Sequence, residues 1–327
     1  MHYAIVDIMK ALACLLIVNF HSDIMYPENI RILAFGGDLG NNIFFLVSGF
    51  TLWPSIERSI QAGNGWQWFK KRFWRIFPMF FCFNMAMFLV ARFRLETVSK
   101  FVSYFIFPTN YWFVTAIILF YVLLYAIEKL VNSETLRLMI PVLLAALHLI
   151  YNNDFAERYF VGFAAVLIGC ELHRSNMLRR LAKLENSVFM VCTVAFAVVY
   201  CVLKLLRARG AELYGLIFLG VGIAAVSLSA AILLWGLIRE KSLAQLCKKF
   251  PQAWQGVRWL SKVTLAVYLT NVFCDRLLTR LLLSKFRFPI SYVLNLVITI
   301  LIASVATMMN DHIGKKLRCE MARTSRK

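Results

Sequence analysis

Long apolar segments separated by short polar ones run along almost the whole chain. Ten of them reach or approach the length of about 20 residues that a membrane-spanning helix needs. They are residues 4–26, 38–56, 73–91, 110–128, 138–152, 159–172, 187–204, 213–238, 261–283 and 290–310. Because hydrocarbon offers the backbone no hydrogen-bond partners, this pattern predicts an all-α fold, a polytopic bundle of about ten transmembrane helices.

Composition and charge agree with a membrane location. Hydrophobic residues make up 61% of the chain, charged residues 16%, and the mean hydropathy is +0.69, which excludes an ordinary soluble domain. Ten spans put both termini on one side, where 23 of the 36 lysines and arginines then lie, against 10 on the other side. This bias predicts cytoplasmic termini. The net charge of +19 indicates topology and attraction to anionic lipid headgroups, and we expect no nucleic-acid partner.

The first span carries Asp7, Lys10 and His21. Ionisable residues are costly in hydrocarbon and point to a functional site by default. Lys10 and His21 are eleven residues apart, so they share one helix face about 16 Å apart, and Asp7 lies one turn before the lysine, where it can pair with it. The alternative is a lysine that extends to the membrane surface and a histidine that serves only packing.

Two further motifs follow. Arg72 and Arg75 are three residues apart in a basic stretch, and we expect them at the start of a helix, where two guanidinium groups suit a phosphate or pyrophosphate. The alternative is a topology anchor. In the second span, Ser48 and Gly49 would let another helix backbone approach closely.

Taken together, these segments resemble the acyltransferase 3 family of integral-membrane O-acyltransferases. The resemblance rests on five stretches: Asp7-x-x-Lys10 with His21, Phe44 to Phe50, Arg72-x-x-Arg75-Ile-x-Pro78, Tyr111-Trp112-Phe113, and Ser261 to Tyr268-Leu269. It implies transfer of an acyl group, usually acetyl from cytoplasmic acetyl-CoA, to a hydroxyl of a surface glycan or lipid-linked sugar. It also implies that Lys10, His21, Arg72 and Arg75 are essential. Asn271 stands where many members have histidine, so an acid or base role there is in doubt.

The resemblance and the residues together define the expected site. His21 is the candidate base, or transient acyl carrier, with Lys10 and Asp7 on the same helix, and Arg72 and Arg75 would hold the CoA phosphates. Tyr268, Asn271, Arg276 and Arg280 are candidates for acceptor binding, although the two arginines could equally be interfacial anchors. Trp112, Ser48 and Gly49 count as packing or motif residues.

Remaining expectations concern organisation and partners. We expect a transmembrane acyltransferase domain over residues 1–310, a basic cytoplasmic tail over 311–327, and a location in the bacterial cell inner membrane. No bound cofactor and no metal site are expected, with acetyl-CoA as substrate and membrane lipids as partners. The rival function is a transporter or flippase of a glycan or lipid-linked sugar, which usually shows an internal repeat; the chain shows no convincing one.

Overall fold

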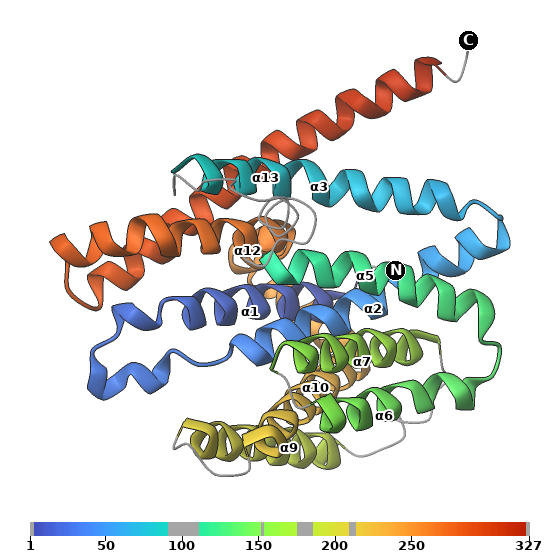
Figure 1. The fold of residues 1–327 in the computed structure, drawn as a ribbon, viewed down its shortest axis with the longest axis horizontal. Helices are drawn as coiled ribbons and strands as arrows, with labels where there is room; N and C mark the ends of the chain where they lie inside the picture. The colour runs from blue at the N-terminus through green and yellow to red at the C-terminus, as the bar shows by residue number, and fades with distance from the viewer. Residues whose placement is uncertain (1–2, 91–110, 152–153, 175–185, 209–213, 325–327) are drawn as a thin grey trace. The chain divides into compact units, whose positions relative to one another are not determined.

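Helices account for nearly all of the described chain. The computed structural model describes residues 3–90, 111–151, 154–174, 186–208 and 214–324 (Figure 1), and no strand occurs among them. The helices are α1 (Ala4–His21), α2 (Gly37–Gln61), α3 (Gly65–Val90), α5 (Trp112–Leu130), α6 (Glu134–Tyr151), α7 (Asp154–Arg174), α9 (Asn186–Ala208), α10 (Tyr214–Ile238), α11 (Glu240–Lys249), α12 (Pro251–Lys285) and α13 (Ile290–Thr324). The predicted all-α class is confirmed, and each of the ten predicted segments falls on a helix.

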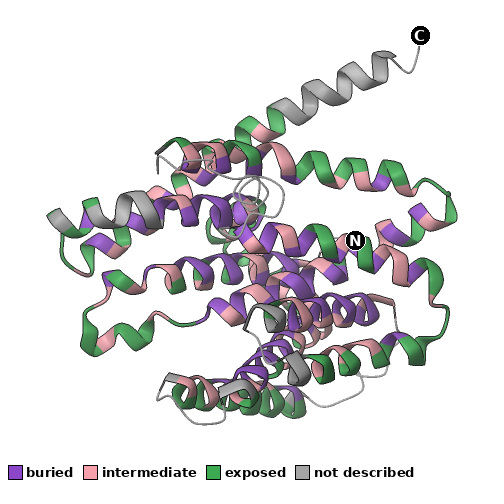
Figure 2. Cartoon of the chain, viewed as in Figure 1, coloured by how far each residue is buried: buried purple, intermediate pink, exposed green. Residues whose placement is uncertain are grey.

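Within the described residues, six helical segments are long and apolar enough to cross a membrane: Ala4–His21, Glu28–Gln61, Trp112–Leu130, Ser187–Arg207, Leu216–Ile238 and Ile290–His312. The count of ten spans and the side of the termini stay predictions. Large apolar side chains remain uncovered along α9 and α13 (Figure 2), where Val191 is 64% exposed and Met308 72% exposed. Apolar helix surfaces of this kind are what a lipid environment covers.

Two segments differ from the expected pattern. The basic stretch after α10, expected as a loop, forms α11 and the first turns of α12, so α12 begins ten residues before the predicted span. Helix α3 likewise begins at Gly65, eight residues before the predicted span at 73. A hydropathy window detects only the apolar part of a helix. A basic or aromatic extension can continue the same hydrogen-bonded helix without being detected. The predicted domain boundary at residue 310 falls within α13.

The helices group into two compact units. Unit 1 comprises residues 1–16, 36–63 and 120–261, and unit 2 comprises residues 17–35, 64–119 and 262–327. Helices α1, α5 and α12 contribute residues to both units.

In unit 1, helices α2 and α7 pack at close range through glycines. A Cβ atom on Gly49 would lie 2.0 Å from the carbonyl oxygen of Val166, and one on Gly169 would lie 2.0 Å from the carbonyl oxygen of Leu46. The Cys170 thiol also contacts the Gly49 carbonyl oxygen at 3.2 Å. Only glycine permits this backbone approach, which is how helices associate tightly in membranes.

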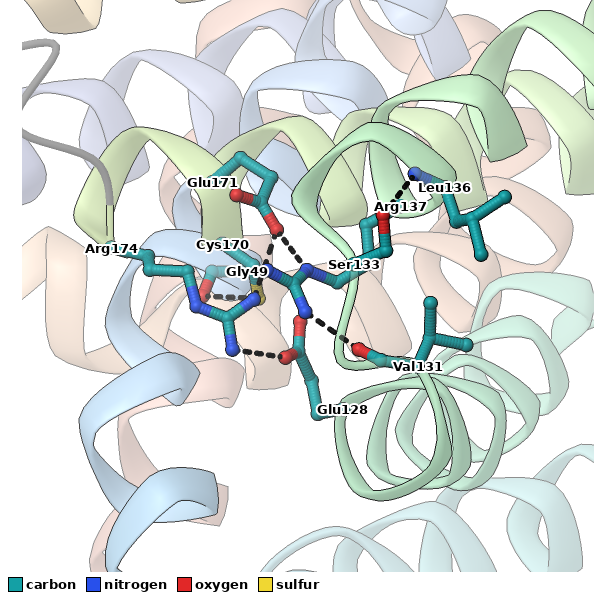
Figure 3. Close-up of polar contacts among 9 residues, drawn as sticks. All are labelled: Gly49, Glu128, Val131, Ser133, Leu136, Arg137, Cys170, Glu171 and Arg174. Atoms are coloured by element: carbon teal, nitrogen blue, oxygen red, sulfur yellow. Dashed lines mark hydrogen bonds and ion pairs between the residues drawn. The ribbon is translucent and has the colours of Figure 1, made fainter.

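Four charged side chains form a network at the α5–α6–α7 end of unit 1 (Figure 3). Arg137 Nε donates to Glu171 Oε1 at 2.9 Å, and Arg137 also donates to the carbonyl oxygen of Val131 at 2.6 Å. Arg174 pairs with Glu171 at 3.2 Å and with Glu128 at 3.0 Å. The Glu128 side chain is fully buried and that of Arg137 is 6% exposed. Two arginines and two glutamates balance in charge.

The network also reaches helix α2. The Arg174 guanidinium lies 4.1 Å from the centre of the Trp53 ring, an arrangement that gains from cation–π attraction. Beside it, the His173 ring packs on Phe50 with centroids 4.6 Å apart. The last turn of α7 is therefore fixed to α2 on one side and to α5 and α6 on the other.

Replacing Gly169 by alanine should destabilise the protein by about 1–3 kcal/mol, because the new methyl group overlaps the α2 backbone. Thermal unfolding in detergent would measure the effect as a lowered Tm. Gly256→Ala is the matched control, since no atom outside the neighbouring backbone lies within 4 Å of its would-be Cβ. An unchanged Tm for Gly169→Ala would contradict the described α2–α7 contact.

Arg137→Gln should cost about 3–5 kcal/mol, the usual penalty for removing one partner of a buried ion pair. Arg31→Gln serves as the control because Arg31 and Asp23 pair at an exposed site, with side chains 54% and 44% exposed, where pairs contribute about 1 kcal/mol at most. Unfolding of both variants in denaturant gives the comparison. Equal losses of stability would show that the network is not a buried one.

Candidate functional site

Helix α1 positions the three ionisable residues of the first span. Its sequence contains neither proline nor glycine, so it runs unbroken from Ala4 to His21. Asp7 is 8% exposed, and its Oδ1 accepts a hydrogen bond from the Ser261 hydroxyl of α12 at 2.6 Å. Lys10 and His21 are half-buried. The separation of eleven residues on one helix gives the expected common face and about 16 Å of rise.

The first turn of α1 has a second polar contact. The backbone N–H of Ala4 donates to Glu240 Oε1 at 2.6 Å, which satisfies one of the free donors at the start of the helix. Nearby, Gly236 of α10 faces Ile5 so closely that a Cβ would lie 2.1 Å from the isoleucine side chain. Two polar bonds and one tight apolar contact therefore fix the first turns of α1 within unit 1.

The segment after His21 folds back onto α1 in unit 2. It forms two short 3-10 helices, Asp23–Met25 and Glu28–Leu33. Asn19 lies at the centre of its contacts: the amide nitrogen donates to the carbonyl oxygens of Leu33 and Phe35, and the amide oxygen accepts from the hydroxyls of Tyr26 and Tyr292 at 2.6 and 3.1 Å. All the hydrogen-bonding capacity of this amide is used.

Further polar residues extend this cluster along α13. The Asn295 amide donates to the Ser22 hydroxyl at 3.2 Å, and both residues are buried. The Tyr26 ring packs on Phe288 and Tyr292, with ring centroids 5.0 and 5.3 Å apart. Sequence reasoning missed this cluster, although an asparagine inside an apolar span, two residues before the histidine, was a usable signal.

Arg72 and Arg75 lie on α3, but not at its start. Since α3 begins at Gly65, seven residues before Arg72, the expectation of a helix N-terminus at this pair is wrong. Arg72 is half-buried, with its guanidinium 5.4 Å from the centre of the buried Trp68 ring. Arg75 is exposed, and its carbonyl oxygen accepts from the Asn310 amide at 3.3 Å. Any anion binding here must rest on the side chains rather than on free backbone donors.

Tyr268 and Asn271 lie one turn apart on α12 and are both buried. The Tyr268 ring packs on Phe113 with centroids 4.3 Å apart, and Phe113 in turn meets Trp112 edge-on. Neither polar atom of the Asn271 side chain has a hydrogen-bond partner among the described residues. A buried amide left without partners typically costs about 1–3 kcal/mol, so it marks a position suited to a polar ligand.

The expected site residues thus divide between the two units. Unit 2 contains His21, Arg72, Arg75, Trp112, Tyr268 and Asn271, whereas unit 1 contains Asp7, Lys10, Ser48 and Gly49. Ser48 is half-buried on α2, next to the glycine that meets α7. The side chains of Arg276 and Arg280 lie outside the described residues, so their predicted role in acceptor binding stays a prediction.

Comparison with known proteins bears on this arrangement. No curated protein and no solved structure matches the chain. The family model described as an acyltransferase domain matches residues 3–309, a range that contains α1 with its three ionisable residues, the arginine pair of α3, and Tyr268 and Asn271 of α12. Since this match covers nearly the whole chain, the protein belongs to this family of membrane acyltransferases, acyltransferase 3.

Proposed function

We propose that this protein is an O-acetyltransferase that moves acetyl from cytoplasmic acetyl-CoA to a hydroxyl of a cell-surface polysaccharide or lipid-linked sugar. Family membership supports acyl transfer, and it favours this activity over transport of a glycan. The observation that carries the proposal is α1: a half-buried lysine and a half-buried histidine on one face of an apolar helix. A structural helix in hydrocarbon would not need either residue.

His21 has the chemistry that the reaction needs. In the direct route, its neutral imidazole takes the proton from the acceptor hydroxyl while the oxygen attacks the thioester carbonyl carbon. The carbon–sulfur bond then breaks, and the imidazolium returns the proton to the departing CoA thiolate. In the alternative route, an imidazole nitrogen attacks the thioester carbon and the carbon–sulfur bond breaks, releasing CoA thiolate. The acceptor hydroxyl then attacks the acetyl-imidazolium, the carbon–nitrogen bond breaks to restore the imidazole, and the hydroxyl proton balances the charge of the thiolate. Lys10 lies on the same helix face about 16 Å from His21, too far to contact an oxyanion formed there, and we propose that its positive charge attracts the anionic donor.

Arg72 is the better placed of the two arginines to hold the donor. Its guanidinium is half-buried on Trp68, so its orientation is restricted before any ligand arrives. Bidentate hydrogen bonds from such a group suit the phosphates of CoA. Arg75 is exposed on the next turn and would add a second charge.

For the acceptor, we propose the buried pair on α12. Asn271 has an amide whose donors and acceptor are unused within the described chain, and a sugar hydroxyl can satisfy both. Tyr268 one turn away contributes an aromatic ring already packed on Phe113. Arg276 and Arg280 on the same helix are candidates for an anionic part of the acceptor.

The proposed location is the bacterial inner membrane, with both termini in the cytoplasm.

His21→Ala should abolish acetylation of the surface glycan, with a loss of about 100-fold or more in rate, while the protein still accumulates in the membrane. Mass spectrometry of the polysaccharide, beside membrane protein abundance, measures both effects. His312→Ala is the matched control because that imidazole is exposed on α13. Wild-type acetylation in His21→Ala cells would refute the proposed role of α1.

Arg72→Lys should raise the KM for acetyl-CoA about tenfold although the positive charge is kept, because lysine lacks the planar fork that binds a phosphate bidentately. Steady-state kinetics on the purified, detergent-solubilised protein would show this. The same change at Arg58, an exposed arginine of α2 whose Nε donates to the Pro54 carbonyl oxygen, is the control. If both variants keep the wild-type KM, Arg72 serves topology alone.

A further inference from the structure

Helix α11 follows the membrane-spanning helix α10 almost directly in the chain. Residues Leu216–Ile238 of α10 are long and apolar enough to span, and only Arg239 separates α10 from α11. The backbone hydrogen bonds continue through this turn, from Arg239 N to Trp235 O and from Leu243 N to Arg239 O. Because one residue spans only about 3.5 Å, α11 must begin at the depth where α10 leaves the hydrocarbon.

The short helix has two opposite faces. Leu243 and Leu246 lie one turn apart on an apolar face of the helix, and Phe250 follows directly after its last residue; Leu246 and Phe250 are each 53% exposed. Lys241 and Lys248 lie on the other face, and Lys249 lies beside it at the end of the helix; all three are exposed. This division of apolar and basic residues is typical of helices that lie in the plane of a membrane surface.

A third, narrower face attaches α11 to α1. Glu240 begins this face and accepts the hydrogen bond from the Ala4 N–H. Cys247 lies two turns further along it, where partial burial and then the charges of Glu240 and Asp7 raise the pKa of its thiol. Beyond α11, Ser261 donates to Asp7. The segment from 240 to 261 is therefore hydrogen-bonded to the first turns of α1 at both of its ends. These bonds fix the rotation of α11 about its own axis.

The start of α12 continues the same surface character. Arg258 and Trp259 are exposed, the tryptophan by 45%. Tryptophan and basic residues are enriched where a protein meets the boundary between headgroups and acyl chains. The exposed charge of α11 is almost entirely positive, because its one carboxylate, Glu240, already accepts a bond from α1. The complementary partner is an anionic lipid surface.

We propose that α11 is an anionic-lipid-binding helix, with Leu246 and Phe250 at the acyl boundary and Lys241, Lys248 and Lys249 against lipid phosphates. Lipid contact at α11 then supports the first turns of α1, at Ala4 and near Asp7, through the bonds described above. This inference concerns the membrane surface and stands whether or not the acetyl donor and glycan acceptor proposed above are correct.

Hydrogen–deuterium exchange of the full-length protein in lipid nanodiscs tests the proposal. Nanodiscs of phosphatidylcholine would be compared with nanodiscs containing about one-third phosphatidylglycerol. We expect amide exchange across residues 241–250 to slow several-fold with the anionic lipid, and exchange at Glu28–Leu33 to stay unchanged. Equal exchange at 241–250 in the two lipids would overturn the proposal.

Matched variants separate a lipid surface from other causes. In the triple variant Lys241→Gln, Lys248→Gln and Lys249→Gln, amide exchange at 241–250 should no longer depend on phosphatidylglycerol. With arginine at the same three positions the dependence should remain, because anionic headgroups attract positive charge of either shape. Retained dependence in the glutamine variant would refute the role of the lysines. Acetyl-CoA added to phosphatidylcholine nanodiscs should have no effect at 241–250; slowing there would assign these lysines to the donor instead.

Discussion

Hydrocarbon offers a polar group nothing to bond to, and this constraint determines most of what the chain does. Backbone groups are satisfied within helices, so the described chain is all-helical. Polar side chains that remain must find partners inside the protein. Arg137 meets Glu171, Asn19 binds four groups, and Asp7 accepts from Ser261. Each polar contact therefore also fixes a helix–helix or helix–loop relation that apolar packing alone leaves loosely determined.

Against that background, Asn271 is conspicuous. It is 1% exposed, and its amide has no partner among the described residues, whereas Asn19 uses every donor and acceptor it has. The two asparagines illustrate two uses of the same side chain. The satisfied amide of Asn19 holds a loop in place, while the unsatisfied amide of Asn271 has the donors and acceptor that we propose for a sugar hydroxyl.

The sequence was sufficient to predict the apolar helices, because long apolar segments in hydrocarbon must satisfy their own backbone groups. The roles of Lys10 and His21 on α1 stay predictions. The sequence was not sufficient to predict the Glu128–Arg137–Glu171–Arg174 network. Those residues look like ordinary polar flanks, and only the fold decides which flanks meet. The start of α3 was missed for a related reason: its first two turns contain tryptophans, lysines and arginine, which a hydropathy window does not count as part of a span.

An unbroken helix also fixes the distance between any two of its residues. Lys10 and His21 lie on α1 with no glycine or proline between them, so their separation of about 16 Å cannot shorten without loss of backbone hydrogen bonds. An acyl group that reacts at one residue and is bound at the other must therefore itself move along the helix, because the helix cannot bring the two side chains together.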